Sequence, residues 1–393
     1  MRTNQSVGRS LLAFAIVSIF GAVTEVVAQS QNQAPLYQVD PDWPKPLPNR
    51  WLVGAVVGVA VDSKDHVWIV HRPATLQPNE TRAIWRAAPP VIEFDPEGNV
   101  VSAWGGPGNG YDWPDLEHGI HVDSDDHVWL GGGGAEDAQI LKFTRNGEFV
   151  MQIGQKGQNG GSNDTENLGG AAHMVIDHAT TELYVADGYV NHRVIVFDAE
   201  SGAYKRHWGA FGNRPDDTYF EAAGERLPSP FSGAVQHENA PSQYDPNGPS
   251  PTEFRITHCV RIANDGLVYV CDRTNDRIQV FRKDGTFVQE AFLAKETLGS
   301  GSVWDIAFSN DAEQTYLLVP DGTNQEVRVL IRDTLEVVSA FGQAGRWAGQ
   351  FYGAHNIAAD SNGDLYITET YEGKRIQKFR FEGMGPRKAP WVQ

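Results

Sequence analysis

Short runs of alternating apolar and polar residues recur from residue 57 to residue 379, separated by turns rich in Asp, Asn and Gly. One run begins at His118 and continues as Gly-Ile-His-Val-Asp, and a Ser-Asp-Asp turn then leads to Val128, Trp129 and Leu130. Strict alternation between such turns is typical of antiparallel strands that are buried on one face. The pattern therefore predicts many short hairpins and an all-β chain.

The hairpins belong to a longer unit that occurs six times, beginning at Val57, His118, Ala172, His258, Trp304 and His355. A sheet of four short strands cannot bury both of its faces alone, so neighbouring sheets must stack on one another. Six such sheets close into a six-bladed β-propeller with four antiparallel strands per blade, which also protects the sheet edges. The last unit lacks an outer strand, and we predict that the N-terminal stretch around residues 36–39 supplies it and closes the ring.

A second pattern marks the end of the second predicted strand and the start of the third. Residues 272–281 follow the order Asp-Arg-Thr-Asn-Asp-Arg-Ile-Gln-Val-Phe, and residues 187–197 are a close variant of it. This pattern resembles the NHL repeat family. The resemblance extends over all six units and implies a propeller of the NHL type.

Residues 1–28 predict a signal peptide. Arg2 and Arg9 precede an apolar run from Leu11 to Val23, and small residues up to Ala28 offer a cleavage site. We therefore expect residues 29–393 to form the propeller in a periplasm or outside the cell, with no membrane attachment after cleavage. An uncleaved anchor is the alternative.

Two long segments interrupt the repeat, at residues 73–90 and 210–253. Connections of this length in a compact domain are usually functional covers or flexible segments. We interpret the second segment, which is rich in Pro, Ser and Asn, as a lid over one face.

The formal net charge of −18 argues against nucleic acid and anionic membranes as partners, because both require a basic face. We expect a monomer that binds a small molecule or a peptide C-terminus. The two cysteines, Cys259 and Cys271, lie about opposite one another across a predicted turn. In an oxidising compartment they could form a disulfide, and two small buried thiols are the alternative.

Three histidines occupy the same place in alternate units: His118, His258 and His355 begin the first strands of the second, fourth and sixth units. Six-fold closure separates these blades by about 120°, so the three imidazoles are expected to converge on the ring axis and to leave a fourth coordination position open. This arrangement favours zinc or another divalent transition metal. Three channel-lining histidines that bind only water are the alternative.

His173 lies near the corresponding place in the third unit, but its register is ambiguous. The apolar alternation makes Ala172 the counterpart of the three histidines, which would turn His173 away from the channel. Counting back from Asp187 makes His173 the counterpart instead. We prefer the first register and leave a role as a fourth ligand open.

The ends of the second strands should emerge at the same rim as the three histidines. We therefore expect Arg72, Tyr189 and Arg273, which lie at these strand ends, to be close to the three histidines. Together with residues 58–62 and the runs that begin at the three histidines, these residues resemble the peptidyl-α-hydroxyglycine α-amidating lyases. That family folds as a six-bladed propeller and splits a C-terminal α-hydroxyglycine into a peptide amide and glyoxylate.

The resemblance implies specific roles for these residues. The zinc ligands of the family correspond to His118, His258 and His355, its catalytic tyrosine to Tyr189, and its two active-site arginines to Arg72 and Arg273. A structural calcium ion in the family corresponds to the backbone oxygens of Val59 and Ile120 and to Asn356, where the family has Asp.

The resemblance therefore implies a zinc-dependent carbon–nitrogen lyase that acts on a carbinolamide. Zinc would polarise the substrate hydroxyl, Tyr189 would act as the base with a pKa lowered by zinc and arginine, and Arg72 or Arg273 would clamp the substrate carboxylate. Two alternatives are a metal-dependent hydrolase or lactonase on the same propeller, and an NHL scaffold that binds partners without chemistry.

Overall fold

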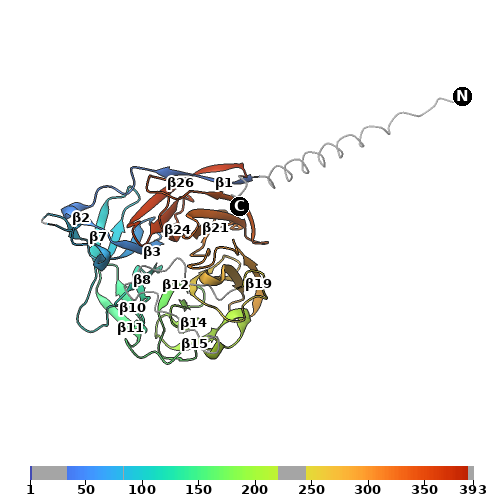
Figure 1. Ribbon diagram of the computed structural model, residues 1–393, viewed down its shortest axis with the longest axis horizontal. Coiled ribbons are helices and arrows are strands. Elements are labelled where there is room, and N and C mark those ends of the chain that lie inside the picture. The colour runs from blue at the N-terminus through green and yellow to red at the C-terminus, as the bar shows by residue number, and fades with distance from the viewer. Residues whose placement is uncertain (2–32, 83, 220–244, 388–393) are drawn as a thin grey trace.

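The computed structural model describes Met1 and residues 33–82, 84–219 and 245–387, and it shows six four-stranded antiparallel sheets arranged as a ring (Figure 1). Blade one contains β3 (Ala55–Val61), β4 (Val67–Arg72), β6 (Val91–Phe94) and β7 (Val100–Trp104). Blade two contains β8 (Glu117–Val122), β9 (His127–Gly132), β10 (Gln139–Thr144) and β11 (Phe149–Gly154). Blade three contains β12 (Ala171–Asp177), β13 (Glu182–Asp187), β14 (Arg193–Asp198) and β15 (Tyr204–Trp208).

The second half of the ring repeats this order. Blade four contains β16 (Thr257–Ile262), β17 (Val268–Asp272), β18 (Arg277–Phe281) and β19 (Phe287–Phe292). Blade five contains β20 (Ala307–Phe308), β21 (Tyr316–Asp321), β22 (Glu326–Ile331) and β23 (Glu336–Phe341). Blade six contains β24 (Ala354–Ala359), β25 (Leu365–Glu369), β26 (Arg375–Pro386) and β1 (Gln33–Asp40). The predicted all-β, six-bladed propeller is confirmed.

The ring is closed by β1, which pairs antiparallel with β26 as the outer strand of blade six. Tyr37 faces Phe381 in this pairing, and its ring lies 5.2 Å from that of Phe341 in blade five. The N-terminal strand therefore joins the last blade to its neighbour, and the prediction that residues 36–39 supply the missing strand is confirmed.

The apolar core lies between the blades. Six buried clusters are found among the described residues, and each combines side chains of two neighbouring blades. Trp68 of blade one, for example, packs in one cluster with Ile120 and Leu130 of blade two. This is the packing expected for sheets that cannot bury both faces alone.

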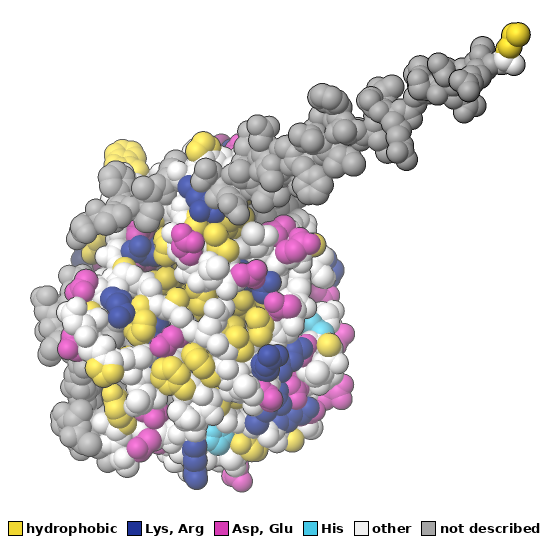
Figure 2. Space-filling view, turned by 90° about the vertical axis from the view of Figure 1, so that its right-hand side faces the viewer, with side chains coloured by type: hydrophobic (Ala, Val, Ile, Leu, Met, Phe, Trp, Pro, Cys, Tyr) yellow, Lys and Arg dark blue, Asp and Glu magenta, His cyan; other side chains and the backbone are white. Residues whose placement is uncertain are grey.

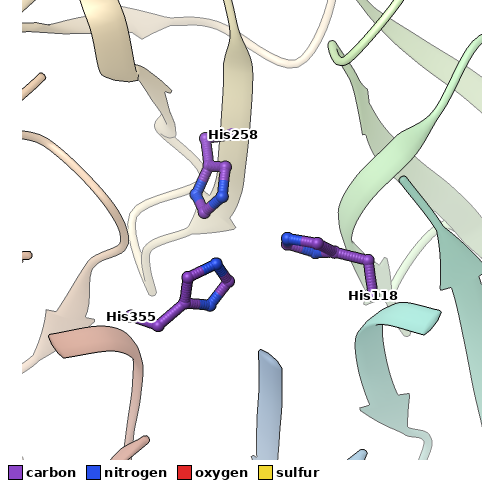
Figure 3. Close-up of side chains that lie close together, drawn as sticks. All are labelled: His118, His258 and His355. Carbon is purple, nitrogen blue, oxygen red and sulfur yellow. The ribbon is translucent and has the colours of Figure 1, made fainter. Parts of the chain in front are cut away.

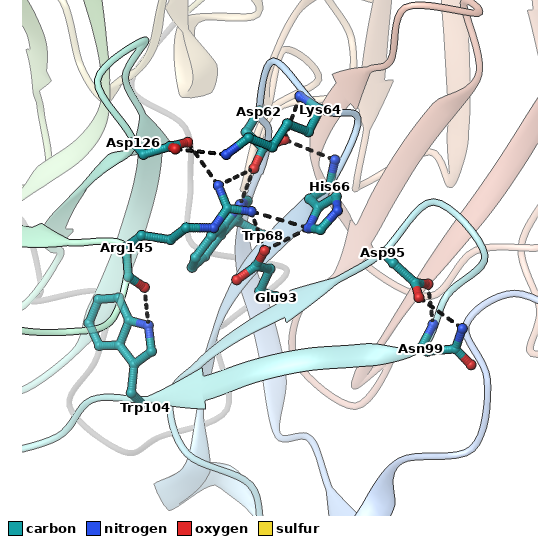
Figure 4. A network of polar contacts seen from close by, with 10 residues as sticks. All are labelled: Asp62, Lys64, His66, Trp68, Glu93, Asp95, Asn99, Trp104, Asp126 and Arg145. Carbon is teal, nitrogen blue, oxygen red and sulfur yellow. Dashed lines mark hydrogen bonds and ion pairs between the residues drawn. The ribbon is translucent and has the colours of Figure 1, made fainter.

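Buried carboxylates fix the turns between the first two strands of a blade. Asp62 accepts hydrogen bonds from the backbone N–H groups of Lys64 and His66 and from the indole of Trp68, and it pairs at 2.9 Å with Arg145 of blade two (Figure 4). Burial raises the pKa of Asp62, but these hydrogen bonds and Arg145 lower it by a larger amount, so the net shift of the pKa is downward. The turn is thus tied both to its own blade and to the next one.

The Asp-Asn-Arg pattern has a structural basis at the opposite end of the second strand. Asp272 accepts hydrogen bonds from Arg277 at 2.8 Å and from Asn275 at 2.7 Å, and all three side chains are buried. Asp187 makes the same contacts with Arg193 and Asn191. Each buried carboxylate therefore has a charged partner and further donors, as a buried ion pair requires.

The segment at residues 73–90 leaves the ring between β4 and β6. It contains the 3₁₀ helix η2 (Pro73–Thr75) and β5 (Arg86–Ala87), which pairs in parallel with β2 (Trp51–Leu52). Three further 3₁₀ helices are η1 (Pro48–Arg50), η3 (Ala210–Gly212) and η4 (Arg273–Asn275).

Two predicted features lie wholly or largely outside the described residues: the signal peptide at 1–28, and the lid at 210–253, of which residues 220–244 are not described. Within the described part of the chain, no helix has the length and apolar character needed to cross a membrane.

Candidate metal centre and active site

His118, His258 and His355 converge on the ring axis from β8, β16 and β24 (Figure 3). Their ring centroids lie 4.9–5.2 Å apart, and one nitrogen of each lies within 4.8 Å of the others. All three side chains are buried. The geometry predicted from their positions in alternate units is therefore present.

A β-bulge at the same place in each inner strand aims these side chains. The register of strand pairing shifts between His118 and Ile120 in blade two, between Thr257 and Cys259 in blade four, and between Ala354 and Ile357 in blade six. A bulge adds one residue to a strand and redirects its side chains. Because the shift recurs, one local irregularity turns three equivalent residues towards a common point.

Hydrogen bonds at Nδ1 orient the three rings and favour one tautomer. His118 Nδ1 donates to the carbonyl of Ala172 at 2.7 Å, and His258 Nδ1 donates to the carbonyl of Trp304. His355 Nδ1 donates to the side-chain oxygen of Asn356. With the proton on Nδ1, the lone pair of each Nε2 is available to a metal ion.

Burial lowers the pKa of all three histidines, to about 3 for His355 and well below the usual range for His118 and His258. Neutral imidazoles with oriented Nε2 atoms are the form in which histidine binds a metal. The residues therefore fit a divalent transition-metal ion.

The hydroxyl of Tyr189 lies 2.8 Å from His118 Nε2 and 3.0 Å from His258 Nε2. Its ring fits because Gly133 and Gly170 line it: a Cβ atom at either position would lie within 3.0 Å of the tyrosine side chain. Burial raises the pKa of Tyr189, whereas Arg273 and Arg72 lower it, and burial outweighs them. The two arginines thus act in the direction that the sequence analysis expected, and burial gives a net upward shift of this pKa.

Arg273 lies beside this phenol. Its Nη1 donates to the Tyr189 hydroxyl at 3.4 Å, and its guanidinium lies 4.4 Å from the centroid of the Trp304 ring. Its Nε–H has no hydrogen-bond acceptor among the described residues. The neighbouring Asp272 pairs with Arg277 instead, so an ion pair between Arg273 and Asp272 is excluded.

Arg72 approaches the site from the end of β4. It is buried, and its Nε–H donates to the carbonyl of Glu117 at 2.8 Å. Like Arg273, it acts electrostatically on Tyr189. Acidic side chains are spread among Lys and Arg over the face drawn in Figure 2, whereas this site holds two buried guanidinium groups and three neutral imidazoles. The site therefore favours an anionic ligand.

Two aromatic residues at the site were missed by the sequence analysis. Trp304 occupies in blade five the place that histidine has in blades two, four and six, and its ring lies 5.4 Å from that of His355. Tyr371 lies beyond β25; burial raises its pKa, and Arg273, Tyr189 and Arg72 act on it electrostatically. The alignment of the repeats could have indicated both residues, because Tyr371 stands two residues after the end of β25, as Tyr189 stands two residues after the end of β13.

His173 lies outside the group of three. It is the residue after Ala172 in β12, and burial lowers its pKa to about 3, with Arg261 and Asp305 as charged neighbours. The preferred register, with Ala172 as the counterpart of the three histidines, agrees with the strand pairing, in which Ala172 lies at the bulge of β12 as His258 lies at the bulge of β16.

The residues matched to a calcium site, Val59, Ile120 and Asn356, do not fit that ion in this chain. The amide nitrogen of Asn356 donates to the carboxylate of Asp305 at 3.0 Å, so its oxygen faces His355 Nδ1 and is already in use. The predicted calcium ligand set therefore lacks its side-chain oxygen, and we assign no role to calcium.

Among the described residues, two other groups of acidic residues and histidines lie close enough to be considered as metal ligands. The first group is formed by Asp62, His66 and Glu93 (Figure 4). The guanidinium of Arg145 forms ion pairs with both carboxylates, so their negative charge is already balanced by a side chain of the protein. The second, formed by Asp123, Asp125 and His127, lies in a turn, and Asp123 accepts the backbone N–H groups of the other two. Both groups are thus explained by the structure of the turns.

Cys259 and Cys271 form a disulfide between β16 and β17, with Cα atoms 4.8 Å apart. Of the two alternatives left open by the sequence, the disulfide is therefore the one observed. It lies one residue after His258 and two residues before Arg273, and it fixes these two site residues relative to each other.

Comparison with known proteins agrees with this architecture. The family model described as "NHL repeat" matches residues 254–281. This match covers the hairpin of blade four that carries His258 and Arg273, and the resemblance to NHL-repeat proteins stated from the sequence is confirmed.

Among curated proteins, the chain is 26% identical to NHL repeat-containing protein 3 of Mus musculus, over 78% of this chain and 70% of that protein. It is 25% identical to peptidyl-alpha-hydroxyglycine alpha-amidating lyase 1 of Drosophila melanogaster, over 86% of this chain and 58% of the relative. A solved structure of a protein of unknown function from Bacteroides thetaiotaomicron superposes with a TM-score of 0.52 and 15% identity, over 89% of this chain and 76% of the other. The last likeness concerns the fold alone.

Proposed function

We propose that the protein is a zinc-dependent lyase that cleaves the carbon–nitrogen bond of an α-hydroxyglycine-type carbinolamide and releases an amide and glyoxylate. The observation that carries the proposal is the convergence of His118, His258 and His355 with the Tyr189 hydroxyl 2.8 Å from one of their nitrogens. The similarity to an amidating lyase of Drosophila melanogaster supports the same chemistry.

The side chains divide the reaction between binding and proton transfer. Arg273 and Arg72 bind the substrate carboxylate, because both are buried cations and Arg273 has an unused N–H donor. The three imidazoles would hold a zinc ion, which when bound would supply Lewis-acid polarisation of the substrate hydroxyl oxygen. Arg273 and Arg72 lower the pKa of Tyr189 against the effect of burial, and a bound cation would lower it too. The Tyr189 phenolate would then accept the hydroxyl proton and return it to the amide nitrogen as the carbon–nitrogen bond breaks, so that the base is regenerated.

We also propose that the protein works in a periplasm or outside the cell. The disulfide between Cys259 and Cys271 supports this location, because disulfides form and persist in oxidising compartments. The partners in this proposal are the small-molecule or peptide substrate and the metal, and neither nucleic acid nor a membrane is included.

Metal analysis of the purified protein, followed by a glyoxylate assay with a peptide that ends in α-hydroxyglycine, tests the proposal. We expect about one zinc ion per chain, loss of zinc in His118→Ala, and unchanged zinc in the control His178→Ala, whose side chain is exposed. Tyr189→Phe should keep zinc but release glyoxylate about 10²–10⁴-fold more slowly. Zinc-loaded protein that releases no glyoxylate would contradict the lyase, and a folded wild type that binds no zinc would favour a binding scaffold.

A further inference from the structure

The three histidines differ in what holds their Nδ1 atoms. For His118 and His258 the acceptor is a backbone carbonyl of the following blade, Ala172 and Trp304 respectively. For His355 it is the side chain of its own neighbour, Asn356. One of the three rings is therefore oriented by a group that can be changed by mutation without touching the backbone.

Asn356 is itself held by a buried carboxylate. Its amide nitrogen donates to Asp305 Oδ2 at 3.0 Å, and the backbone N–H of Ile357 donates to the same oxygen at 3.1 Å. Asp305 is fully buried. Because a carboxylate can only accept these hydrogen bonds, the amide cannot turn over, and its oxygen must face His355.

A cation completes the chain. Arg261 pairs with Asp305 through two hydrogen bonds, of 2.8 and 3.2 Å, and also donates to the carbonyl of Ile357 at 2.9 Å. Burial raises the pKa of Asp305, but Arg261 and the hydrogen bonds lower it by a larger amount. The net shift of the pKa is downward, so the carboxylate is ionised. The three residues come from blades four, five and six, and they link the inner strands that carry His258 and His355.

We propose that Arg261, Asp305 and Asn356 are positioning residues for the metal centre, an inference that rests on the proposed zinc site. The negative charge of Asp305 polarises the Asn356 amide, and its oxygen thus becomes a stronger acceptor for the Nδ1 proton of His355. A stronger acceptor at Nδ1 fixes the ring and makes Nε2 a better ligand. Arg261 supplies the positive charge that keeps this carboxylate stable in the interior.

The test compares zinc affinity, measured by competition with a chromophoric chelator, in the wild type and Asn356→Ala. We expect a 10–100-fold loss of affinity. The variant should fold, because Asp305 keeps Arg261 and the Ile357 N–H as partners. The control is Asn324→Ala, which removes a similar hydrogen bond to a carboxylate, that of Asp321 at 2.7 Å, in a blade that carries none of the three histidines; its zinc affinity should equal that of the wild type.

A second readout does not depend on metal. In ¹⁵N spectra of histidine-labelled, metal-free protein, Asn356→Ala should change the ring signals of one histidine of the three from the Nδ1-protonated form to a mixture of tautomers. Folded Asn356→Ala with wild-type zinc affinity and unchanged ring signals would overturn the inference. Absence of zinc binding by the wild type would instead overturn the proposed function, while the ring signals would still decide whether Asn356 orients His355.

Discussion

Single buried carboxylates make the stability of this protein dependent on pH. Asp276 is fully buried at the end of η4 in a left-handed conformation (φ 54°), and it accepts the backbone N–H groups of Ser302 at 2.7 Å and Leu298 at 3.3 Å. Burial nevertheless dominates and raises the pKa of Asp276 to about 8. The folded protein therefore keeps a proton on this group at pH values where the unfolded chain has lost it.

Asp276→Asn should remove this dependence. Folding raises the pKa of this carboxyl group from about 3.9, the value in an unfolded chain, to about 8. Between these two pH values the unfolded chain releases the proton and the folded protein keeps it, so the free energy of unfolding falls as the pH rises. The free energy of unfolding of the wild type, relative to that of the variant, should fall by up to about 1.4 kcal/mol per pH unit across this range. Urea unfolding at several pH values measures the slope; the control Asp333→Asn, at an exposed site, should follow the wild type.

The disulfide shows how one pair of strands supports the site. It joins directly opposite residues of β16 and β17 and closes a short loop, with a sequence separation of 12. A cross-link of this size stabilises a fold by about 2–3 kcal/mol, mainly by restricting the unfolded chain.

Replacing both Cys259 and Cys271 by Ala should lower the free energy of unfolding by about 2–3 kcal/mol. Urea unfolding with and without reductant checks this value. Reductant should destabilise the wild type and leave the double variant unchanged. Equal stability of wild type and double variant under oxidising conditions would show that the disulfide contributes nothing.

The elements that could be predicted from sequence are those that repeat. The strand pattern and the place of His118, His258 and His355 follow from comparing one unit with the next, because each blade meets the same packing requirement. Contacts between different blades could not be predicted this way. Asp305 reaches Asn356 across 51 residues, and this contact is what turns the Asn356 oxygen towards His355. The pKa of Tyr189 also depends on burial that only the assembled ring provides.

At the scale of the whole molecule, closure depends on β1. Tyr37 and Val39 pack against the core between blades five and six, and β1 covers the edge of the 12-residue strand β26. Both side chains are partly buried, so their packing contributes less than the roughly 1.5–3 kcal/mol of a fully buried apolar side chain each. An uncovered strand of this length offers unpaired N–H and C=O groups to another molecule.

Removing residues 1–40 should therefore lower the melting temperature and cause self-association, which size-exclusion chromatography detects. The control lacks residues 1–28 only, keeps β1, and should elute as a single species. A monomeric protein of unchanged melting temperature without β1 would contradict its role in closing the ring.

The use of β1 in blade six also sets the order of events during synthesis. The strand that leaves the ribosome early finds its partner only after the intervening blades have been made. The ring cannot close on a growing chain, so the final assembly step takes place after translation.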